Sequence, residues 1–474
     1  MSELNISLLA PFMIIATAPI IIMITVTISR NYKVVYGFSL FMFLAAFLSL
    51  FFIMPNTPVI IKPLFIIDSY SVLFLGIIFL VSFVITVLSY IYLNHHGGER
   101  EEYFIILFVA AFGASVLVIS DNFISFFLGL ETLSISLYVL VSYLKSRASS
   151  IEAGVKFLVI ASISTSFLLF GMALLYAASG TMSFKEISAS FLLHDTSQLL
   201  FLTGIGMMLV GIGFKLALVP FHMWTPDVYQ GAPSPVSAFI ATISKGAVLA
   251  VFLRFFYDIR GFQNNALFIL VSGIAILSMF TGNLLALKQT NFKRLLAYSS
   301  IAHLGYLLIT VLTGTIAGTQ AAVFYLVSYM ITTLGAFGVI SVLSLCENDA
   351  EEIEGFKGLF WKNPWIAIVL TLTLLSLAGI PLTAGFIGKF YLALAGFKSG
   401  LWILVISMII NSVISLYYYL RVIKVMFTIT EKESFQKISI SAYTVLAIVA
   451  LGIIFLGIMP SWLIDFIARF SILS

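Results

Sequence analysis

Charged residues are scarce in this sequence, and their scarcity is the first guide to its class. Asp, Glu, Lys and Arg make up 9% of the 474 residues, against about 25% in an average soluble domain. Hydrophobic residues make up 61%, and the mean hydropathy is +1.14. This composition excludes a soluble enzyme, a disordered regulator and a secreted disulfide-rich domain. A net charge of +4 gives no reason to expect nucleic-acid binding.

Residues that hold redox centres are also rare. The only cysteine, Cys346, excludes an internal disulfide bond and cannot hold an iron–sulfur cluster, which needs about four thiolates. The histidines are too scattered to indicate a haem pair; they are His95, His96, His194, His222 and His303. We therefore expect any redox chemistry to belong to a partner.

Long apolar runs fill the chain instead. A helix needs about 20 mostly apolar residues to cross a bilayer, and fourteen segments meet this requirement, which predicts an all-α membrane protein. No basic residue precedes Arg30, so a cleaved signal peptide is not expected. Segment 178–197 is too polar to cross and is expected at an interface. The expected spans are roughly 6–29, 33–54, 69–93, 103–120, 122–143, 151–177, 198–219, 235–258, 266–287, 291–313, 318–346, 365–395, 401–428 and 438–468.

The distribution of Lys and Arg predicts the orientation of these spans. The odd-numbered connections between spans carry fourteen basic residues, whereas the even-numbered connections and the C-terminus carry six. An even number of spans puts both termini on one side. Because basic residues favour the inner side, the sequence predicts a multi-pass protein of the cell membrane with both termini outside.

Two spans contain a proline that should break the helix. Pro220 and Pro381 are five spans apart, and Asn122-Phe123 opens the fifth span as Asn291-Phe292 opens the tenth, 169 residues later. We interpret spans 4–8 and 9–13 as two inverted five-helix repeats, each with a broken helix; chance similarity between apolar segments is the alternative. The expected divisions are an N-terminal three-helix segment at 1–100, a first repeat at 101–260, a second repeat at 261–430 and a C-terminal helix at 431–474.

Four ionisable side chains stand out deep inside the expected spans, where each costs roughly 2.5–3.5 kcal/mol. Glu131 lies in the fifth span, and Lys215, Lys245 and Lys389 lie in the seventh, eighth and twelfth. Structural ion pairs, or lysines that reach the membrane surface, are the alternative explanation. Because burial disfavours the charged form of an amine, lysines so placed can load and release protons near neutral pH. The four residues therefore predict a proton relay.

Two histidines are weaker candidates for the same relay. His303, beside Ser299 and Ser300, is equally well explained as a packing residue with hydrogen bonds and as a relay group. His222 and Asp227 flank the first break, and we expect them to line a wet vestibule.

Two motifs around these residues resemble a known family. Residues 213–236 are GFKLALVPFHMWTPDVYQGAPSPV, and residues 379–390 are GIPLTAGFIGKF. The chain resembles the antiporter-like membrane subunits of bacterial proton-translocating NADH:quinone oxidoreductase (respiratory complex I), and among them the N type. The M type has a glutamate where this chain has Lys389. The resemblance covers nearly the whole chain and is strongest over spans 4–13.

The resemblance implies a proton-translocating subunit of a larger enzyme. Glu131 matches the family's fifth-helix glutamate, and Lys215 matches the lysine that pairs with it. Lys245 and Lys389 match the family's lysines in helices 8 and 12. The family binds no prosthetic group in this subunit, so NADH, FMN, iron–sulfur clusters and quinone are expected in the other membrane and peripheral subunits of the complex.

Three other functions share this architecture or part of it. A subunit of a multi-subunit cation/proton antiporter has the same fold and Glu–Lys pair, although the run TPDVYQGAP at 225–233 favours complex I. A membrane subunit of a hydrogenase or F420-type complex would use another electron donor. A passive assembly scaffold is disfavoured by the charges in the membrane.

Overall fold

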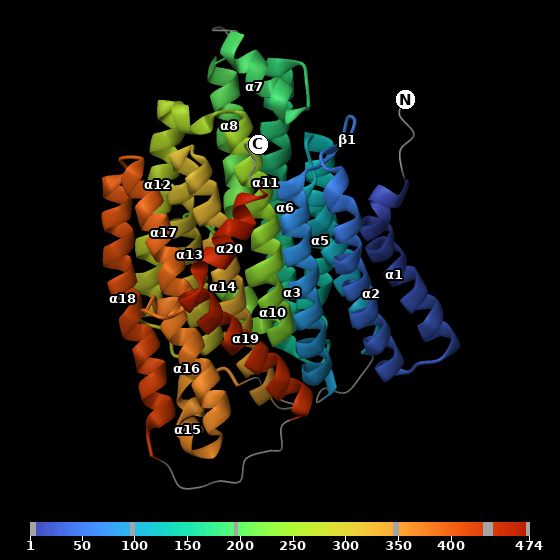
Figure 1. The fold of residues 1–474 in the computed structure, drawn as a ribbon, viewed down its shortest axis with the longest axis vertical. Helices are drawn as coiled ribbons and strands as arrows, with labels where there is room; N and C mark the ends of the chain where they lie inside the picture. Colours follow the sequence, from blue (N-terminus) through green and yellow to red (C-terminus); the bar gives the residue numbers. More distant parts are fainter. Residues whose placement is uncertain (1–5, 95–99, 194–197, 345–349, 430–438, 471–474) are drawn as a thin grey trace.

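The computed structural model describes residues 6–94, 100–193, 198–344, 350–429 and 439–470. The helices run side by side in one bundle, with α7 (Phe184–Leu193) at one end and α15 (Leu359–Lys362) at the other (Figure 1). The chain begins α1 and ends α20 (Pro460–Ala468) on the α7 side, as an even number of spans requires. Four residues discussed above, Cys346, His95, His96 and His194, lie outside the described ranges.

Thirteen helical segments of the described chain are long and apolar enough to cross a membrane. The expected twelfth span is divided into two shorter helices, α16 (Pro364–Ala378) and α17 (Ala384–Lys398). The fourteen expected spans are therefore represented by thirteen continuous candidates and one divided one. The continuous candidates are α1 (Ala10–Ile28), α2 (Tyr32–Ile53), α3 (Ser69–Asn94), α4 (Glu101–Val118), α5 (Phe123–Val141), α6 (Ala148–Ser179), α8 (Gln198–Leu216), the segment Ser234–Asp258, α12 (Asn265–Ala286), α13 (Phe292–Thr313), α14 (Ile316–Leu343), α18 (Trp402–Phe427) and α19 (Ile440–Ile458).

Short elements connect these spans. A two-stranded antiparallel sheet, β1 (Val59–Ile61) and β2 (Phe65–Ile67), joins α2 to α3. The segment expected at an interface contains the short helix α7. The last span, expected as one helix, is divided at Met459 into α19 and α20, where Pro460 begins the second part.

Both expected helix breaks are present. The first of the two broken spans, α8, ends at Leu216, where Ala217 follows with a positive φ of 59°, and helix resumes only at α9 (Trp224–Gly231). At the second break, Gly379 and Leu382 have positive φ values of 87° and 71° between α16 and α17. A positive φ cannot continue a right-handed helix, so these residues and the nearby prolines end it together.

A third irregularity lies in the segment Ser234–Asp258 and was not expected from the sequence. A π-helical turn, Ile240–Ser244, separates α10 (Ser234–Phe239) from α11 (Lys245–Asp258). Such turns are rare and often occur at functional sites. Lys245 is the first residue after this turn.

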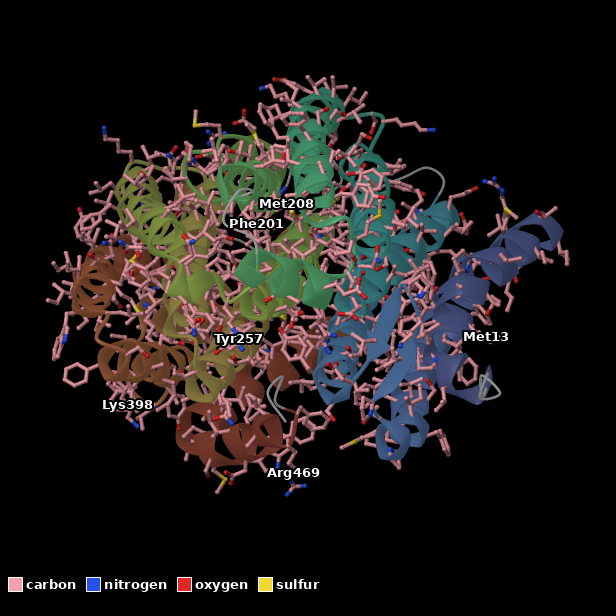
Figure 2. All side chains as sticks on the ribbon, turned by 90° about the horizontal axis from the view of Figure 1, so that it is seen from above. Met13, Phe201, Met208, Tyr257, Lys398 and Arg469 are labelled. Carbon is pink, nitrogen blue, oxygen red and sulfur yellow. The ribbon has the colours of Figure 1, made fainter. Side chains whose placement is uncertain are left out.

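Two segments lie at the centre of the bundle. Every residue in the apolar window of Ser234–Asp258 is buried, as is 94% of the window in α13, whereas the value for α1 and α6 is 33%. Seen from above, Met13 of α1 lies at one edge and Lys398 lies toward the opposite edge (Figure 2). The central segments therefore carry Lys245 and His303, and the outer helices face the surroundings.

Matched contacts support the two five-helix repeats. A Cβ atom on Gly113 would lie 2.5 Å from the backbone nitrogen of Leu133, so only glycine lets α4 approach α5 this closely. In the same way, a Cβ atom on Gly282 would lie 2.7 Å from the backbone nitrogen of Ala302, where α12 meets α13. Both members of the second contact lie 169 residues after those of the first, which is the offset expected from the sequence.

The starts of α5 and α13 repeat a second pattern. Asn122 forms an isolated β-bridge with Ser183, and Asn291 forms one with Glu352. These partners again differ by 169 positions. Each asparagine also caps its helix, because its side-chain oxygen accepts a hydrogen bond from a backbone N–H in the first turn.

Arg254, near the end of α11, ties that helix to the start of α3. Its guanidinium donates hydrogen bonds of 2.9 Å to Asp68 Oδ1 and to Ser71 Oγ. Burial opposes ionisation of Asp68, but the charge of Arg254 and the hydrogen bonds from Ser71 hold the pKa of this carboxyl below its ordinary value. The ion pair is therefore intact at neutral pH.

Candidate functional site

Lys215 lies in the last turn of α8, directly before the first break. Its amine donates a hydrogen bond of 2.5 Å to Ser134 Oγ on α5, and the residue is 8% exposed. The rings of Tyr138 and Phe214 lie 5.9 and 5.7 Å from the amine. Ring faces and one hydroxyl stabilise an ammonium without neutralising it, so a nearby carboxylate can still attract this charge.

Glu131 lies on α5, one turn before Ser134. Its Oε1 atom accepts a hydrogen bond of 3.0 Å from Thr165 Oγ1 on α6. The resemblance implied a direct pair between Glu131 and Lys215, but none of the ion pairs within 4.0 Å in the described residues joins them. The two groups still interact electrostatically. The structure thus holds them as near neighbours with separate hydrogen-bond partners.

Lys245 is completely buried at the centre of the bundle. Its amine donates a hydrogen bond of 2.5 Å to Ser300 Oγ on α13 and lies 5.4 Å from the centre of the Tyr229 ring on α9. The π turn before Lys245 interrupts the regular hydrogen-bond ladder of this span. Sequence spacing could place the lysine in the membrane but could not show this turn.

His303 lies on α13, one turn after Ser300, and is 3% exposed. Its Nδ1 atom shares a hydrogen bond with the Tyr325 hydroxyl on α14, and its Nε2 atom lies 3.4 Å from the Tyr419 hydroxyl on α18. Both Lys245 and Lys389 act on it electrostatically. A histidine with a hydroxyl at each ring nitrogen, between two lysines, has the connections that a relay group needs.

Lys389, on α17, holds the end of the broken span. Its amine donates hydrogen bonds of 2.9 Å to the carbonyl oxygens of Leu377 and Ala378 and to Ser412 Oγ. The two carbonyls belong to the last turn of α16, where a helix carries partial negative charge. Its amine also lies 5.6 Å from the centre of the Tyr306 ring. Lys389 is therefore fixed by the second break itself.

A set of buried polar residues next to Lys389 was missed by sequence reasoning. The Asn283 amide donates hydrogen bonds of 3.0 Å to the Tyr306 hydroxyl and 3.1 Å to Asn411 Oδ1. The Tyr418 hydroxyl donates one of 2.9 Å to Asn283 Oδ1. Two asparagines inside apolar spans were the available signal, because an amide in hydrocarbon needs partners.

His222 lies in the loop of the first break, and it does not join the relay residues. The side chain is 6% exposed, and neither ring nitrogen forms a hydrogen bond of regular geometry with the described residues. Buried polar atoms normally have a protein or water partner. The position is consistent with the wet vestibule that we expected, which stays a prediction.

A groove of about 1030 Å³ opens at the α15 end of the bundle, between α6, α9 and the segment after α14. Asp227 on α9 lies in it and accepts hydrogen bonds from Arg294 at 2.6 Å and Lys156 at 3.3 Å. Burial opposes ionisation of Asp227, but the hydrogen bonds and charges of Arg294 and Lys156 hold its pKa below the ordinary value. Charged residues of both signs line the groove, namely Arg147, Glu152, Lys156, Asp227, Glu351 and Glu352.

The helix α9 connects this groove with the first break. It begins at Trp224, next to His222, and ends at Gly231, which lines the groove. Within the described ranges, no group of three or more His, Cys, Asp or Glu side chains could hold a metal ion.

Comparison with known families matches residues 120–415 to the family described as NADH:quinone oxidoreductase/Mrp antiporter, TM. The chain belongs to this family. The matched region contains Glu131, Lys215, Lys245 and Lys389, as well as both helix breaks. The family expected from the two sequence motifs is confirmed.

Individual relatives agree with this result. The chain is 41% identical over 467 residues to NADH-quinone oxidoreductase subunit N of Methylococcus capsulatus, which covers 96% of this chain and 93% of that protein. A chain in respiratory complex I from Thermus thermophilus is 30% identical with a TM-score of 0.83, covering 96% of this chain and 98% of that one. A chain in the Mrp complex from Dietzia sp. DQ12-45-1b shares the fold, with a TM-score of 0.87 at 16% identity over 98% of this chain and 97% of that one.

Proposed function

We propose that this chain is a proton-translocating membrane subunit of a respiratory NADH:quinone oxidoreductase. Its family and the 41% identity to a subunit N support the assignment to that enzyme. The observation that carries the proposal is the presence of three buried lysines, with His303 under the influence of the second and third. An ammonium in hydrocarbon is costly, so three of them linked by hydroxyls and an imidazole favour proton transfer over packing.

The first step of the mechanism changes the partner of Lys215. Residues three apart on a helix are neighbours, roughly 5–6 Å between their Cβ atoms, so Lys215 can leave Ser134 and reach Glu131. At about 4 Å and an effective dielectric near 20, such a pair is worth about 4 kcal/mol. Moving one charge against roughly 150–200 mV costs about 3.5–4.6 kcal/mol. The free energy of making or breaking this pair is therefore comparable to the free energy of moving one proton across the membrane.

The proton then moves sideways through the bundle. Protons from the inner side load Lys215, and Glu131 sets the proton affinity of that lysine. Lys245 passes the proton through His303 and its tyrosine partners to Lys389, and release follows at the second break. Hydroxyl groups at each stage can accept one proton while they donate another. The hydrogen bonds of Lys245, His303 and Lys389 support this order.

The energy comes from partner subunits. Quinone reduction there changes the contacts of this chain and separates the Glu131–Lys215 pair; NADH, FMN, iron–sulfur clusters and quinone bind in those subunits. This chain takes part as a translocase without a redox centre. We place the groove on the inner side of the cell membrane and both termini outside, because the basic residues favour that orientation. The two repeats, 101–260 and 261–430, are then inserted with opposite orientation.

A second candidate function is cation/proton exchange. The shared fold with a chain of an Mrp complex favours it, and the same buried lysines could exchange protons without an electron-transfer partner. The two functions predict different partner subunits.

Purification of the native complex distinguishes them. The membranes are solubilised in mild detergent, the co-purifying subunits are identified by mass spectrometry, and NADH:quinone activity is measured. Flavin and iron–sulfur subunits with inhibitor-sensitive activity are the expected result. Only small membrane subunits and no redox activity would support the antiporter and contradict the proposal.

The relay itself is tested in that complex with Lys215→Ala. We expect a lower ratio of protons pumped to electrons transferred. The matched control is Lys424→Ala, because Lys424 is exposed near the end of α18. Wild-type pumping by the Lys215 variant at equal electron flux would show that this lysine does not carry protons.

A further inference from the structure

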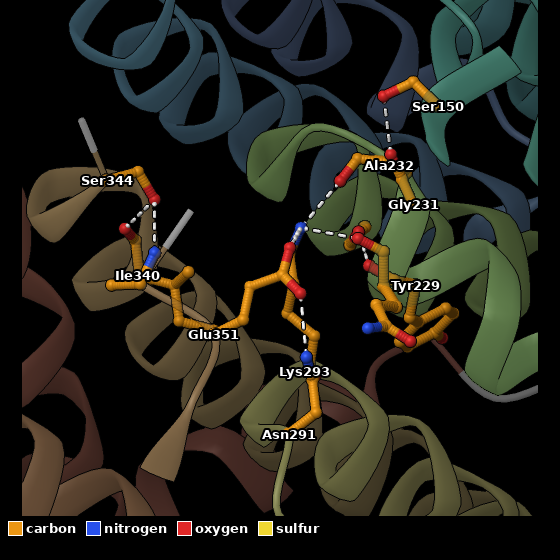
Figure 3. A network of polar contacts seen from close by, with 12 residues as sticks. Ser150, Tyr229, Gly231, Ala232, Asn291, Lys293, Ile340, Ser344 and Glu351 are labelled. Carbon is orange, nitrogen blue, oxygen red and sulfur yellow. Dashed lines mark hydrogen bonds and ion pairs between the residues drawn. The ribbon is translucent and has the colours of Figure 1, made fainter. Parts of the chain in front are cut away.

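The C-terminal end of α9 is fixed from three directions. The last carbonyls of a helix have no partners within the helix, yet four consecutive carbonyls here each accept a hydrogen bond from a side chain (Figure 3). Lys293 on α13 provides two of these bonds, and Ser150 on α6 and Ser237 on α10 provide the others. The bonds are Ser237 Oγ to Tyr229 O at 2.9 Å, Lys293 Nζ to Gln230 O at 3.1 Å and to Ala232 O at 2.8 Å, and Ser150 Oγ to Gly231 O at 2.7 Å.

Lys293 is the centre of this arrangement. It is completely buried beneath the groove, and its amine lies 3.4 Å from Glu351 Oε1. The other carboxylate oxygen of Glu351 accepts a hydrogen bond of 2.7 Å from Asn291 (Figure 3). Breaking one partner of a buried pair strongly destabilises a fold. A neutral side chain would be easier to bury at position 293 than a lysine. The hydrogen bonds with which Lys293 holds the end of α9 therefore account for the lysine at this position.

Tyr229, the first of the four residues, points toward the relay. Its ring lies 5.4 Å from the Lys245 amine and packs edge-on against Phe337 at 5.8 Å. Its hydroxyl faces Ser300 and is buried, and it forms no hydrogen bond of regular geometry with the described residues. A buried hydroxyl without a partner destabilises the folded state, so packing alone does not explain why this residue is a tyrosine.

Tyr229 also lies between the groove and Lys245. Its neighbours Gln230 and Gly231 line the groove, whereas its ring contacts Lys245. Along α13, Lys293 and Ser300 lie seven residues apart on one face, about 10 Å along the axis. One tyrosine side chain therefore lies between the solvent-facing end of α9 and the central lysine.

We propose that Tyr229 conducts protons from the groove to Lys245 and that Lys293 is the positioning residue that keeps it there. This inference rests on the proposed function. A protonated water that enters from the groove gives a proton to the phenol oxygen while the phenol gives its own hydrogen to the neutral Lys245 amine, and neutral water remains. The tyrosine is neutral before and after, and one proton has moved from the groove to the lysine. Lys245 is thus loaded directly from the groove as well as from Lys215.

Tyr229→Phe tests the conducting role in the purified complex reconstituted into vesicles. The substitution keeps the ring contacts with Lys245 and Phe337 and removes only the hydroxyl. A packing role predicts unchanged pumping; conduction predicts a proton-to-electron ratio below the wild-type value and above that of Lys245→Ala, because Lys215 still loads Lys245. Tyr103→Phe is the matched control, because Tyr103 is a buried tyrosine that bonds Ser89 instead. A wild-type ratio in Tyr229→Phe overturns the inference.

Lys293 is tested with two substitutions. We expect Lys293→Met to lower the ratio and Lys293→Arg to restore it, because arginine can bond the same carbonyls but does not release a proton at neutral pH. An assembled Lys293→Arg complex that pumps no better than Lys293→Met overturns the positioning role. The Lys245→Ala complex separates the two proposals: normal pumping there contradicts the proposed function itself, whereas lost pumping there with normal pumping in Tyr229→Phe contradicts only this inference.

Discussion

Replacing Lys389 by arginine separates two roles of this residue. The lysine caps α16 through the carbonyls of Leu377 and Ala378, and it is proposed to carry protons. Arginine keeps the positive charge and the donors, so the cap should persist. It also keeps its proton: freeing it at neutral pH costs about 7 kcal/mol, which leaves on the order of one guanidinium in 10⁵ neutral. Lys389→Arg should therefore assemble normally and fail to translocate.

Lys389→Met gives the contrasting result. It removes the charge and leaves both carbonyls without this donor, at roughly 1–3 kcal/mol for each unsatisfied group. We expect this variant to be less stable than Lys389→Arg in detergent and equally unable to translocate. If Lys389 only capped α16 and carried no protons, the methionine variant would translocate poorly and the arginine variant would translocate normally.

The assay compares proton uptake with quinone reduction in the same vesicles. Thermal unfolding of each purified complex, followed by tryptophan fluorescence, reports the stability of the cap. If Lys389→Arg pumps like the wild type at equal electron flux, Lys389 only holds the helix end, and proton transfer through the second break is refuted.

Three further substitutions probe other parts of the fold. Thr165→Val removes the hydrogen bond to Glu131, worth about 1.5–3 kcal/mol for a charged acceptor, and should slow pumping about tenfold or more in a vesicle assay, whereas Thr165→Ser should not. Gly113→Val should destabilise the protein by roughly 1–3 kcal/mol, because its side chain would collide with the α5 backbone; thermal unfolding measures this. Asp68→Asn should cost roughly 3 kcal/mol at pH 7, because Arg254 loses its partner. Since the folded pKa of Asp68 is lowered, its contribution is complete above about pH 4 and is lost as the pH falls through the folded pKa, so the variant's melting temperature should depend less on pH below about 4.

The helix breaks were predictable because they depend on local chemistry. Proline removes a backbone donor wherever it occurs in a helix, so Pro220 and Pro381 marked both interruptions. The Asn-Phe pairs marked helix starts, and the asparagines do cap α5 and α13. Charges in apolar runs are equally visible, because hydrocarbon penalises them regardless of their neighbours. Glu131 and the three lysines could therefore be named from the sequence.

The remaining features depend on what lies across the bundle. Ser134 and Glu131 lie one turn apart on α5. Which of the two side chains Lys215 bonds depends on their positions in the folded bundle, which the sequence does not show. Lys293 lies at the start of an expected span, and the sequence could not show that α9 and Glu351 bury it completely. Tyrosines occur in apolar spans for packing as well as for hydrogen bonding, so the sequence could not distinguish Tyr229 from the others.

The two breaks hold their lysines in different ways, and this difference bears on where the driving force of the proposed mechanism would act. Lys389 bonds two helix-end carbonyls and Ser412, so its place is fixed as long as the break exists. Lys215 bonds one hydroxyl and has a carboxylate one turn away. An external event can shift an equilibrium only if it changes the contacts of one state relative to the other. In the proposed mechanism the first break offers two such states and the second offers one, so a partner subunit that drives this chain would act on the Glu131–Lys215 end.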